Sequence, residues 1–399
     1  MPKKARISEI ELLRGLAFLA VALQHSIAHY AAVDGVRPAD GLWMTLLLLT
    51  AKFAVPVFIF ITGLVLFYNN DGPLRYGSFI SKRFKDILVP YILWSGVYFT
   101  VSQGLSPHFW PQLGKWSMML ITGKNSYHLW YIVMIFQFYL LFPLFRYIMR
   151  KCAERIFFRW RAIVLAGAGL ICMLLVYNLF RIGEMMTAVD FPVLTPFFTT
   201  YADRNFLYFS FYFILGAAAG MYPERWKYWL LKGRVVYWTV FLFLFGYYAY
   251  TVVQSFGTPP RFHISFNQLS LLRPLITLFL VSSIFVFYTW SKKWTEASGS
   301  AGKRVMNVLG RYSYGAYLSH ALMLKQSYNL DAWLFSGWNA TLRMLMSFLV
   351  CVLLSYAVTI ALSNLPFGKW TVGVSSQHTR QRRQVPVKGT ITIHPSEGG

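Results

Sequence analysis

The sequence feature that most constrains this chain is an apolar segment near the N-terminus that also carries ionisable side chains. Residues 9–30 read EIELLRGLAFLAVALQHSIAHY and are long enough to cross a bilayer as one helix. The ionisable residues in it are Glu9, Glu11, Arg14, His25 and His29. A charged group at the centre of a span costs roughly 2.5–3.5 kcal/mol on insertion scales, so such groups predict a functional site.

Arg14 and His25 stand eleven positions apart in this segment. At about 100° per residue this is close to three turns, so both side chains project from one helix face, about 16 Å apart along the axis. One helix therefore places a permanent cation near one membrane surface and a titratable base at or past the membrane's midplane.

The composition predicts an all-α, polytopic membrane bundle rather than a set of soluble domains. The 399 residues are 56% hydrophobic and 13% charged, and that charged fraction is about half of what soluble domains carry. The formal net charge is +24, which we attribute to basic cytoplasmic loops rather than to nucleic-acid binding. The three cysteines have neither pairing nor zinc-type spacing, so we expect no disulfide framework, no metal site and no bound cofactor.

We expect a transmembrane domain over residues 1–366 and a basic, disordered cytoplasmic tail over residues 367–399. No cleavable signal peptide is expected, because the first apolar run lacks a small-residue cleavage site. The transmembrane domain is predicted to cross the membrane ten times, at residues 10–30, 43–67, 84–103, 128–149, 162–179, 206–222, 235–254, 268–290, 309–327 and 344–363.

The distribution of Lys and Arg agrees with this topology. The segments expected on the cytoplasmic side hold 27 of the 38 basic residues, and the opposite loops hold 8. This is the positive-inside bias, and it predicts that both termini lie in the cytoplasm. We expect a multi-pass protein of the cell membrane, specifically a bacterial plasma membrane.

Several other polar residues lie at or inside the expected spans. Arg83 ends a basic stretch that leads into the third span, where it is either a positive-inside anchor or a ligand for a donor. His128 and Tyr131 belong to the run SYHLWY, which is either part of the aromatic belt or part of a site. In the second span, Pro56 predicts a kink and Thr62-Gly63 a close helix contact.

The run GRYSYGAYLSH near the C-terminus contains Ser313 and His320. On a helix that starts at the cytoplasmic side, His320 lies about 15 Å along the axis, at a depth comparable to that of His25. The two histidines could line one cavity, whereas the alternative for each is a packing histidine with its hydrogen bonds satisfied.

These residues favour one chemistry over several familiar ones, because the chain has no P-loop, no zinc-type cluster and no Gly-x-Ser-x-Gly elbow. A histidine without a metal is the usual general base for a hydroxyl. Arginines near the inner face suit phosphate groups, which they bind bidentately. Acyl-coenzyme A has the matching shape, with phosphates at one end and a thioester on a long arm.

The Arg14 and His25 pair in EIELLRGLAFLAVALQH resembles the Arg-x10-His motif in the first helix of the membrane-bound acyltransferase 3 family. The resemblance continues through most of the chain, in order, in FAVPVFIFITGLVLF, FISKRFKDILVPY, HLWYIVMIFQFYLLFPLF and LGRYSYGAYLSH. It implies transfer of acyl groups, such as acetyl, from acyl-coenzyme A to hydroxyls of envelope glycans, lipids or related acceptors. It also implies that Arg14 and His25 are the essential pair.

The chain departs from the family pattern at a few positions. Thr62 replaces the usual serine before Gly63, and Glu11 stands where aspartate is common, so the hydroxyl and the charge are both kept. We expect no extracytoplasmic hydrolase-like domain of the kind that many polysaccharide-modifying members carry, because the sequence continues only briefly after its last expected span. We therefore expect either direct acylation of the acceptor or transfer through a separate extracytoplasmic transferase.

The sequence thus predicts an integral-membrane O-acyltransferase that transfers groups other than amino-acyl groups. His25 is the expected base, Arg14 and Arg83 bind the donor, and the remaining candidates line the cavity or the acceptor side. Those candidates are Glu11, His128, Tyr131, Ser313 and His320. The expected partners are acyl-coenzyme A, a glycan or lipid-linked sugar, and the bilayer. The alternative is an exporter of polysaccharide or lipid, because buried ionisable groups are common in transporters too.

Overall fold

The computed structural model describes residues 7–104, 107–192, 194–257 and 262–374, and every regular element within these ranges is helical. This confirms the all-α class. The first half of the chain contains α1 (Ser8–Tyr30), α2 (Pro38–Ala51), α3 (Ala54–Asn69), α4 (Tyr76–Arg83), a π-helical turn (Phe84–Leu88), α5 (Val89–Gln103), α6 (Phe109–Thr122), α7 (Trp130–Leu140), α8 (Phe142–Arg155) and α9 (Arg161–Tyr177). The second half contains α10 (Leu179–Val189), α11 (Leu194–Phe198), α12 (Ser210–Met221), α13 (Pro223–Lys232), α14 (Arg234–Gln254), α15 (Pro274–Ala297), α16 (Ser300–Leu334), α17 (Ala340–Asn364) and α18 (Gly368–Val372).

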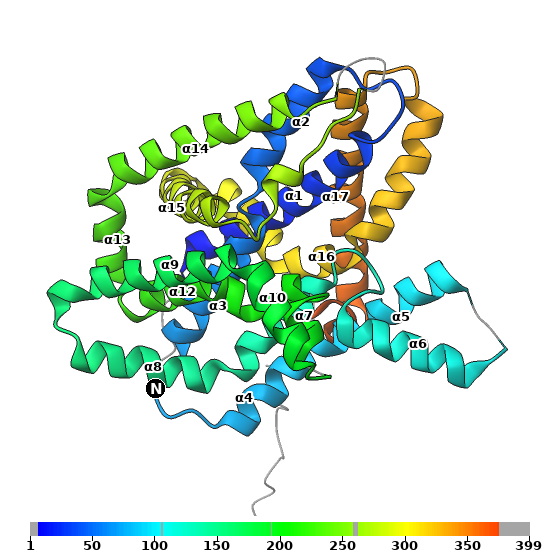
Figure 1. Cartoon of the computed structure of the whole chain (residues 1–399). Helices are drawn as coiled ribbons and strands as arrows, with labels where there is room; N and C mark the ends of the chain where they lie inside the picture. The colour runs from blue at the N-terminus through cyan, green and yellow to red at the C-terminus, as the bar shows by residue number, and fades with distance from the viewer. Residues whose placement is uncertain (1–6, 105–106, 193, 258–261, 375–399) are drawn as a thin grey trace, which may run out of the picture.

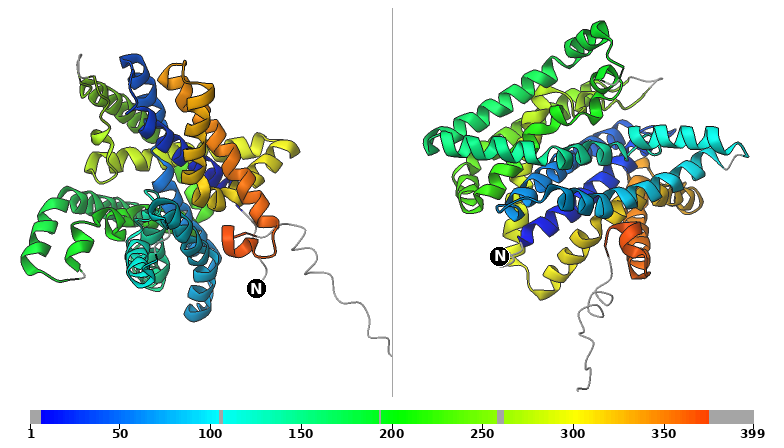
Figure 2. Two further views of the ribbon diagram at one scale, coloured as in Figure 1. Left: turned by 90° about the vertical axis from the view of Figure 1, so that its right-hand side faces the viewer. Right: turned by 90° about the horizontal axis from the view of Figure 1, so that it is seen from below.

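Helix α1 lies at the centre of the bundle, where it packs against α2, α3, α15, α16 and α17 (Figure 1). Its apolar residues are correspondingly buried, including Phe18 and Ile27 with no exposed surface. The α5–α6 pair projects from one edge of the bundle, as the cyan helices in Figures 1 and 2 show. The site candidates on α1 are therefore held by the best-packed part of the protein.

Helices α1 and α16 lie side by side and run in the same direction. Near their starts, a Cβ on Gly310 would lie 2.3 Å from the Glu11 carbonyl oxygen, so only glycine permits this approach. Near their ends, the rings of His29 and Tyr328 stack with centroids 3.7 Å apart. The parallel orientation agrees with the expected first and ninth spans, which would both run from inside to outside.

A second close contact joins α3 to α12. A Cβ on Gly63 would lie 2.3 Å from the Phe213 carbonyl oxygen, and one on Gly216 would lie 2.0 Å from that of Phe60. Small residues let the two backbones approach in this way in membrane bundles. The close contact predicted at Thr62-Gly63 is confirmed.

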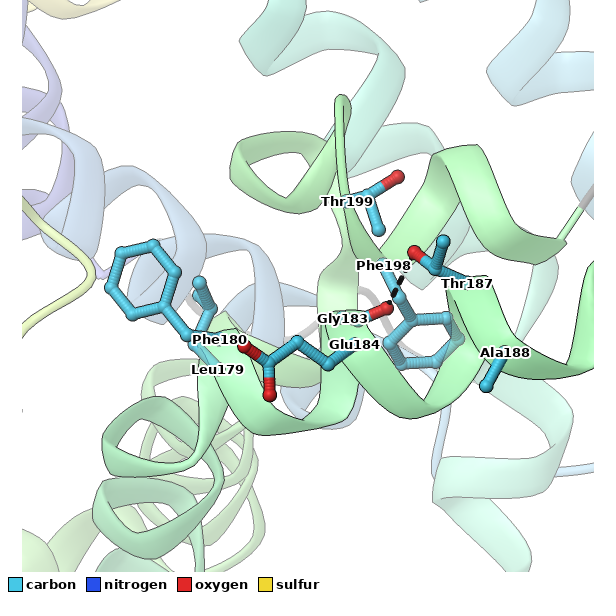
Figure 3. Close-up of a pocket in the computed structure, with 8 residues that line it drawn as sticks. All are labelled: Leu179, Phe180, Gly183, Glu184, Thr187, Ala188, Phe198 and Thr199. Atoms are coloured by element: carbon cyan, nitrogen blue, oxygen red, sulfur yellow. Dashed lines mark hydrogen bonds between the residues drawn. The ribbon is translucent and has the colours of Figure 1, made fainter.

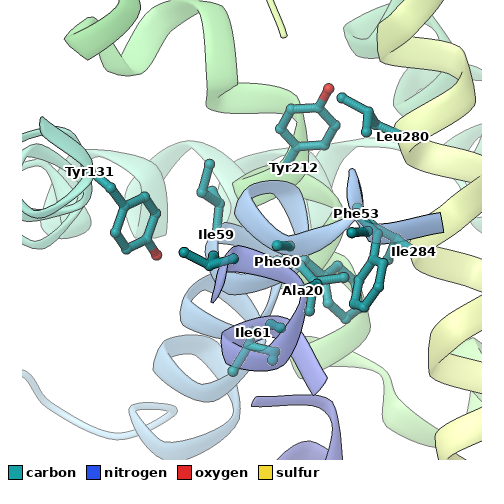
Figure 4. Close-up of a cluster of buried hydrophobic side chains, with 14 of the residues drawn as sticks. Ala20, Phe53, Ile59, Phe60, Ile61, Tyr131, Tyr212, Leu280 and Ile284 are labelled. Atoms are coloured by element: carbon teal, nitrogen blue, oxygen red, sulfur yellow. The ribbon is translucent and has the colours of Figure 1, made fainter. Parts of the chain in front are cut away.

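The core around these contacts is aromatic and aliphatic, and Figure 4 shows part of it. Figure 4 labels Ala20 of α1, Phe53 between α2 and α3, Ile59, Phe60 and Ile61 of α3, Tyr131 of α7, Tyr212 of α12, and Leu280 and Ile284 of α15. Such packing fixes the relative positions of the helices that carry the site.

Five helical segments are long and apolar enough to cross a membrane, and up to eight if each sharply bent helix pair counts as one span. The chain is therefore a polytopic membrane protein, whereas the count of ten and the sidedness of the termini stay predictions. The expected spans 84–103 and 309–327 are helical but fall outside this count. Helix α5 is only 15 residues long, and α16 has 35 residues but is rich in polar side chains.

The expected disordered tail begins too early at residue 367. Residues Gly368–Val372 form α18, which packs on the bundle through buried Gly368 and Val372. The Trp94 indole also donates a hydrogen bond to the Thr371 carbonyl at 3.0 Å. The hydrophobic contact and this hydrogen bond order the segment, while residues 375–399 lie outside the described residues.

Candidate active site

Three histidines from distant parts of the chain meet in the bundle, and we call His25, His128 and His320 the histidine cluster. The His25 and His320 rings are stacked, with centroids 5.4 Å apart and an interplanar angle of 24°. The His128 ring meets that of His320 edge-on at 4.5 Å. His25 comes from α1, His320 from α16 and His128 from the turn before α7.

The turn that delivers His128 depends on Gly123. This residue ends α6 with φ +68°, a left-handed conformation that glycine adopts without strain. A Cβ there would also lie 2.8 Å from the Trp130 Cα atom. Gly123 thus lets the chain fold back tightly, and residues 124–129 place His128 against α16.

The hydrogen bonds of His320 define its protonation state. Its Nδ1 atom lies 2.6 Å from the Tyr317 carbonyl oxygen, which can only accept, so Nδ1 carries the hydrogen. The Nε2 atom therefore presents a lone pair in the neutral ring. This atom is buried and has no hydrogen-bond partner within the described ranges, and His320 as a whole has no exposed surface. An unpaired buried acceptor costs about 1–3 kcal/mol, so it is a natural place for a donor on a substrate.

His128 has a similar arrangement. Its Nδ1 atom lies 3.1 Å from the Ser126 hydroxyl, and its carbonyl oxygen accepts a hydrogen bond from the Tyr317 hydroxyl. Its Nε2 atom is buried, and no partner for it exists in the part of the chain that the structure describes. The sequence left two roles open for His128 in the SYHLWY run, the aromatic belt and a functional site. The burial of its Nε2 atom favours the functional site.

His25 differs from the other two histidines because its side chain is only partly buried. Its ring packs on that of Tyr127 with centroids 4.4 Å apart. Its carbonyl oxygen accepts a hydrogen bond from the Tyr328 hydroxyl at 3.3 Å. His25 is therefore the member of the cluster that a solvent-borne or lipid-borne group can reach.

Tyrosines extend the cluster towards the other end of α1. The Tyr317 ring lies 5.3 Å from His128 and 5.9 Å from Tyr131, measured between centroids. Tyr131 in turn lies within range of the Arg14 charge and of Tyr139. A run of aromatic rings thus links the histidines to Arg14, which sequence reasoning placed on the same helix face.

Arg14 is held by Glu11 one turn earlier. Its guanidinium lies 3.4 Å from the Glu11 carboxylate, which is buried, while about a third of the Arg14 side chain remains exposed. The carboxylate thus orients the cation and leaves part of its surface open to a ligand. The same helix carries Glu9, whose carboxylate accepts a hydrogen bond from the Tyr288 hydroxyl at 3.1 Å.

Arg83 lies beside Tyr139. Its guanidinium stacks over the rings of Phe79 and Tyr139, 5.4 Å from each centroid. Its Nε atom is buried and has no hydrogen-bond partner among the residues described. A π-helical turn, Phe84–Leu88, follows at once, and such turns are frequent at functional sites. Arg14 and Arg83 therefore flank Tyr131 and Tyr139 from two helices.

The sequence predicts Ser313 on the cavity or acceptor side of the site. It is buried, and its hydroxyl donates to the Gly310 carbonyl of its own helix at 2.9 Å. It lies on the α16 face of His320, two turns earlier, because seven residues are close to two helical turns. Its hydrogen bond and burial indicate a role in helix packing rather than in catalysis.

Sequence reasoning missed Lys52 as a site residue. Lys52 and Phe53 form the short break between α2 and α3, and the Lys52 charge reaches His25. Two features of the sequence could have indicated Lys52: it is a lysine inside an apolar span, and Pro56 follows four residues later. The Tyr127 ring on His25 was also missed, because its loop carries no periodic pattern.

Among the described residues, neither a metal centre nor a separate surface hollow competes with this cluster. Within the described ranges, no group of three or more His, Cys, Asp or Glu residues is arranged to hold a metal ion. A hollow of about 640 Å³ lies between α10 and α11 and is lined by Phe180, Gly183, Glu184 and their neighbours (Figure 3). It shares no residue with the histidine cluster or with the arginines.

Two comparisons with known proteins bear on the class of this protein. The profile of the acyltransferase 3 family, which describes an acyltransferase domain, matches residues 7–360. The chain is also similar to YfiQ of Bacillus subtilis (strain 168), a protein inferred to be a membrane-bound acyltransferase, with 24% identity over 391 residues. That match covers 96% of this chain and 99% of YfiQ. No solved structure matches the chain.

The fold and the family profile together define an integral-membrane acyltransferase. The chain belongs to the acyltransferase 3 family, because the profile covers far more than half of its length. Membership favours the enzyme over the exporter that composition alone left open.

Proposed function

We propose that the protein transfers an acyl group, such as acetyl, from acyl-coenzyme A to a hydroxyl of a cell-envelope glycan, glycolipid or related acceptor. The observation that carries this proposal is the contact of half-buried His25 with His320, whose buried Nε2 lone pair has no partner within the described residues. A histidine base that a substrate can reach lies beside a ring nitrogen that can accept a hydrogen bond and has no donor. This pair suits the binding and deprotonation of a hydroxyl nucleophile.

His25 is the general base in this reaction. It takes the proton of the acceptor hydroxyl while the oxygen attacks the thioester carbonyl carbon. The carbon–sulfur bond then breaks, and His25 returns the proton to the sulfur, which leaves as the coenzyme A thiol. The products are an O-acyl ester and free coenzyme A, so atoms and charge balance without a metal or redox partner.

Arg14 and Arg83 bind the donor at the other end of α1. The Arg83 guanidinium stacks on the Tyr139 ring, and part of the Arg14 side chain is exposed. Guanidinium groups suit the phosphates of acyl-coenzyme A. About 16 Å of helix separates Arg14 from His25, a span that the extended pantetheine arm can bridge, with the phosphates at the expected cytoplasmic face.

His128 and His320 line the acceptor side of the cavity. Their buried Nε2 atoms can accept hydrogen bonds from acceptor hydroxyls, or donate one where the tautomer of His128 allows it. The acceptor either reaches His25 directly or receives the acyl group through a separate extracytoplasmic transferase. The expected setting is a bacterial plasma membrane.

Labelling of membranes tests this function. Membranes that contain the protein, supplied with acetyl-coenzyme A labelled in the acetyl group, are expected to gain label in a glycan or lipid fraction. Mild alkali should release that label, because an O-ester hydrolyses where an amide does not. Membranes with the His25→Ala variant are the control. Alkali-stable label, or equal labelling with the variant, would contradict O-acyl transfer by this site.

A further inference from the structure

Lys52 occupies a break in the helix that precedes the close contact between α3 and α12. The cause of the break is Pro56, which has no N–H to bond the Lys52 carbonyl four residues earlier and whose ring clashes with that carbonyl. Helix α2 accordingly ends at Ala51 and α3 begins at Ala54, with the C-cap Lys52 still near helical angles. Pro56 thus interrupts the helix at Lys52 and Phe53.

This break is fixed against α1 beside His25. The Gln24 side-chain amide, from the residue just before His25, donates to the Ala51 carbonyl at 2.9 Å. Phe53 stacks on Phe287 of α15 with centroids 3.7 Å apart and is buried. With one neighbour hydrogen-bonded to α1 and the other packed on α15, Lys52 is fixed one residue from the Gln24 contact, at the level of His25 on α1.

The Lys52 ammonium has no structural role that would account for its cost in a span. Across the described ranges it forms no ion pair and no hydrogen bond, and its side chain is only partly buried. A lysine inside a span is costly to insert. An unpaired, partly accessible cation at the level of His25 is instead suited to a substrate that becomes negatively charged.

We propose that Lys52 is a catalytic residue whose ammonium stabilises the negative charge that develops on the thioester carbonyl oxygen. The inference rests on the acyl-transfer function proposed above and assigns a second group to the same step. While His25 holds the proton of the acceptor, the carbonyl electron pair moves onto oxygen beside Lys52. As that pair re-forms the carbonyl, the carbon–sulfur bond breaks and the sulfur takes the proton from His25.

The other polar groups of the site do not fill this role. Arg14 lies about three turns away along α1. His320 presents a lone pair rather than a donor, because its hydrogen is used on the Tyr317 carbonyl. Among the charged groups that reach His25, Lys52 is the cation.

The test compares Lys52→Met, which keeps the length without the charge, with Lys52→Arg, which keeps the charge. Lys292→Met is the matched control, because Lys292 pairs with Glu296 at 2.7 Å in a surface contact on α15. Each protein, purified in nanodiscs and supplied with a membrane extract as acceptor source, is assayed for coenzyme A release from labelled acetyl-coenzyme A over a range of donor concentrations. Thermal unfolding and direct binding of acetyl-coenzyme A are measured on the same samples.

We expect Lys52→Met to lower kcat on the order of 100-fold, as loss of one oxyanion donor does, with unchanged donor binding. Lys52→Arg should recover part of the rate, and Lys292→Met should match wild type. Unchanged kcat in Lys52→Met would overturn the assignment, as would a loss of donor binding that accounts for the whole effect. If Lys52→Met does not fold, Lys52→Arg provides the test. A folded Lys52→Arg protein whose rate is no higher than that of His25→Ala would overturn the assignment of Lys52. Inactive wild type would instead refute the proposed function itself.

Discussion

His25 and His320 stack face to face with ring centroids 5.4 Å apart, although they lie near opposite ends of the sequence. The contact exists because α1 and α16 run parallel and close, from Gly310 against Glu11 to Tyr328 against His29. His320 is fully buried with its hydrogen committed to Tyr317, whereas His25 is partly accessible. In the proposed function, His25 therefore takes the proton of the acyl acceptor's hydroxyl, and His320 accepts a hydrogen bond from the same acceptor.

Replacing His320 tests its place on the acceptor side. His320→Phe keeps a planar ring but removes the Nε2 lone pair, so the acceptor loses one hydrogen bond. A hydrogen bond of about 1.5 kcal/mol corresponds to roughly a tenfold fall in kcat/KM for the acceptor. Binding of acyl-coenzyme A should not change. His29→Phe, at an exposed histidine of α1, is the control and should retain wild-type kinetics. Full activity in His320→Phe would remove it from the site.

Arg14 is predicted to act through donor binding. Loss of charge-assisted hydrogen bonds worth about 1.5–3 kcal/mol should weaken acyl-coenzyme A binding by roughly 10- to 100-fold in Arg14→Ala. Equilibrium binding of labelled acetyl-coenzyme A in nanodiscs measures this directly. Arg304→Ala removes an exposed arginine at the start of α16 and serves as control. Equal affinity in Arg14→Ala and wild type would exclude the donor-binding role.

The close contact between α3 and α12 makes a stability prediction. Gly216→Ala would place a Cβ 2.0 Å from the Phe60 carbonyl oxygen, so the helices must separate. Overpacking of this kind costs about 1–3 kcal/mol, and we expect a lower unfolding temperature in nanodiscs. Gly246→Ala on α14 has no atom within 4 Å of the new Cβ and should be neutral or slightly stabilising. The prediction fails if the two variants unfold alike.

Much of the site on α1 could be predicted from the sequence, because helical periodicity is local. It places Arg14 and His25 on one face and Glu11 one turn before Arg14. The depth of His320 follows in the same way from the start of its helix. These arguments need only the rise and turn of one helix and the cost of burying charge.

What could not be predicted depends on contacts between distant segments. His128 reaches the cluster through a turn at Gly123, and a turn's direction is not periodic. Pro56 predicts a break, but the Gln24 contact that holds this break against α1 beside His25 joins distant segments. The order at Gly368–Val372 arises from packing on the bundle, which a polar, basic composition does not reveal.

Coenzyme A release by the purified protein tests the central claim most directly. Wild type, His25→Ala and His29→Ala are reconstituted in nanodiscs and supplied with labelled acetyl-coenzyme A and a membrane extract as acceptor source. We predict release by wild type and His29→Ala, and loss of release by His25→Ala with unchanged binding of acetyl-coenzyme A. Release by His25→Ala at the wild-type rate would contradict the assignment of His25 as the base.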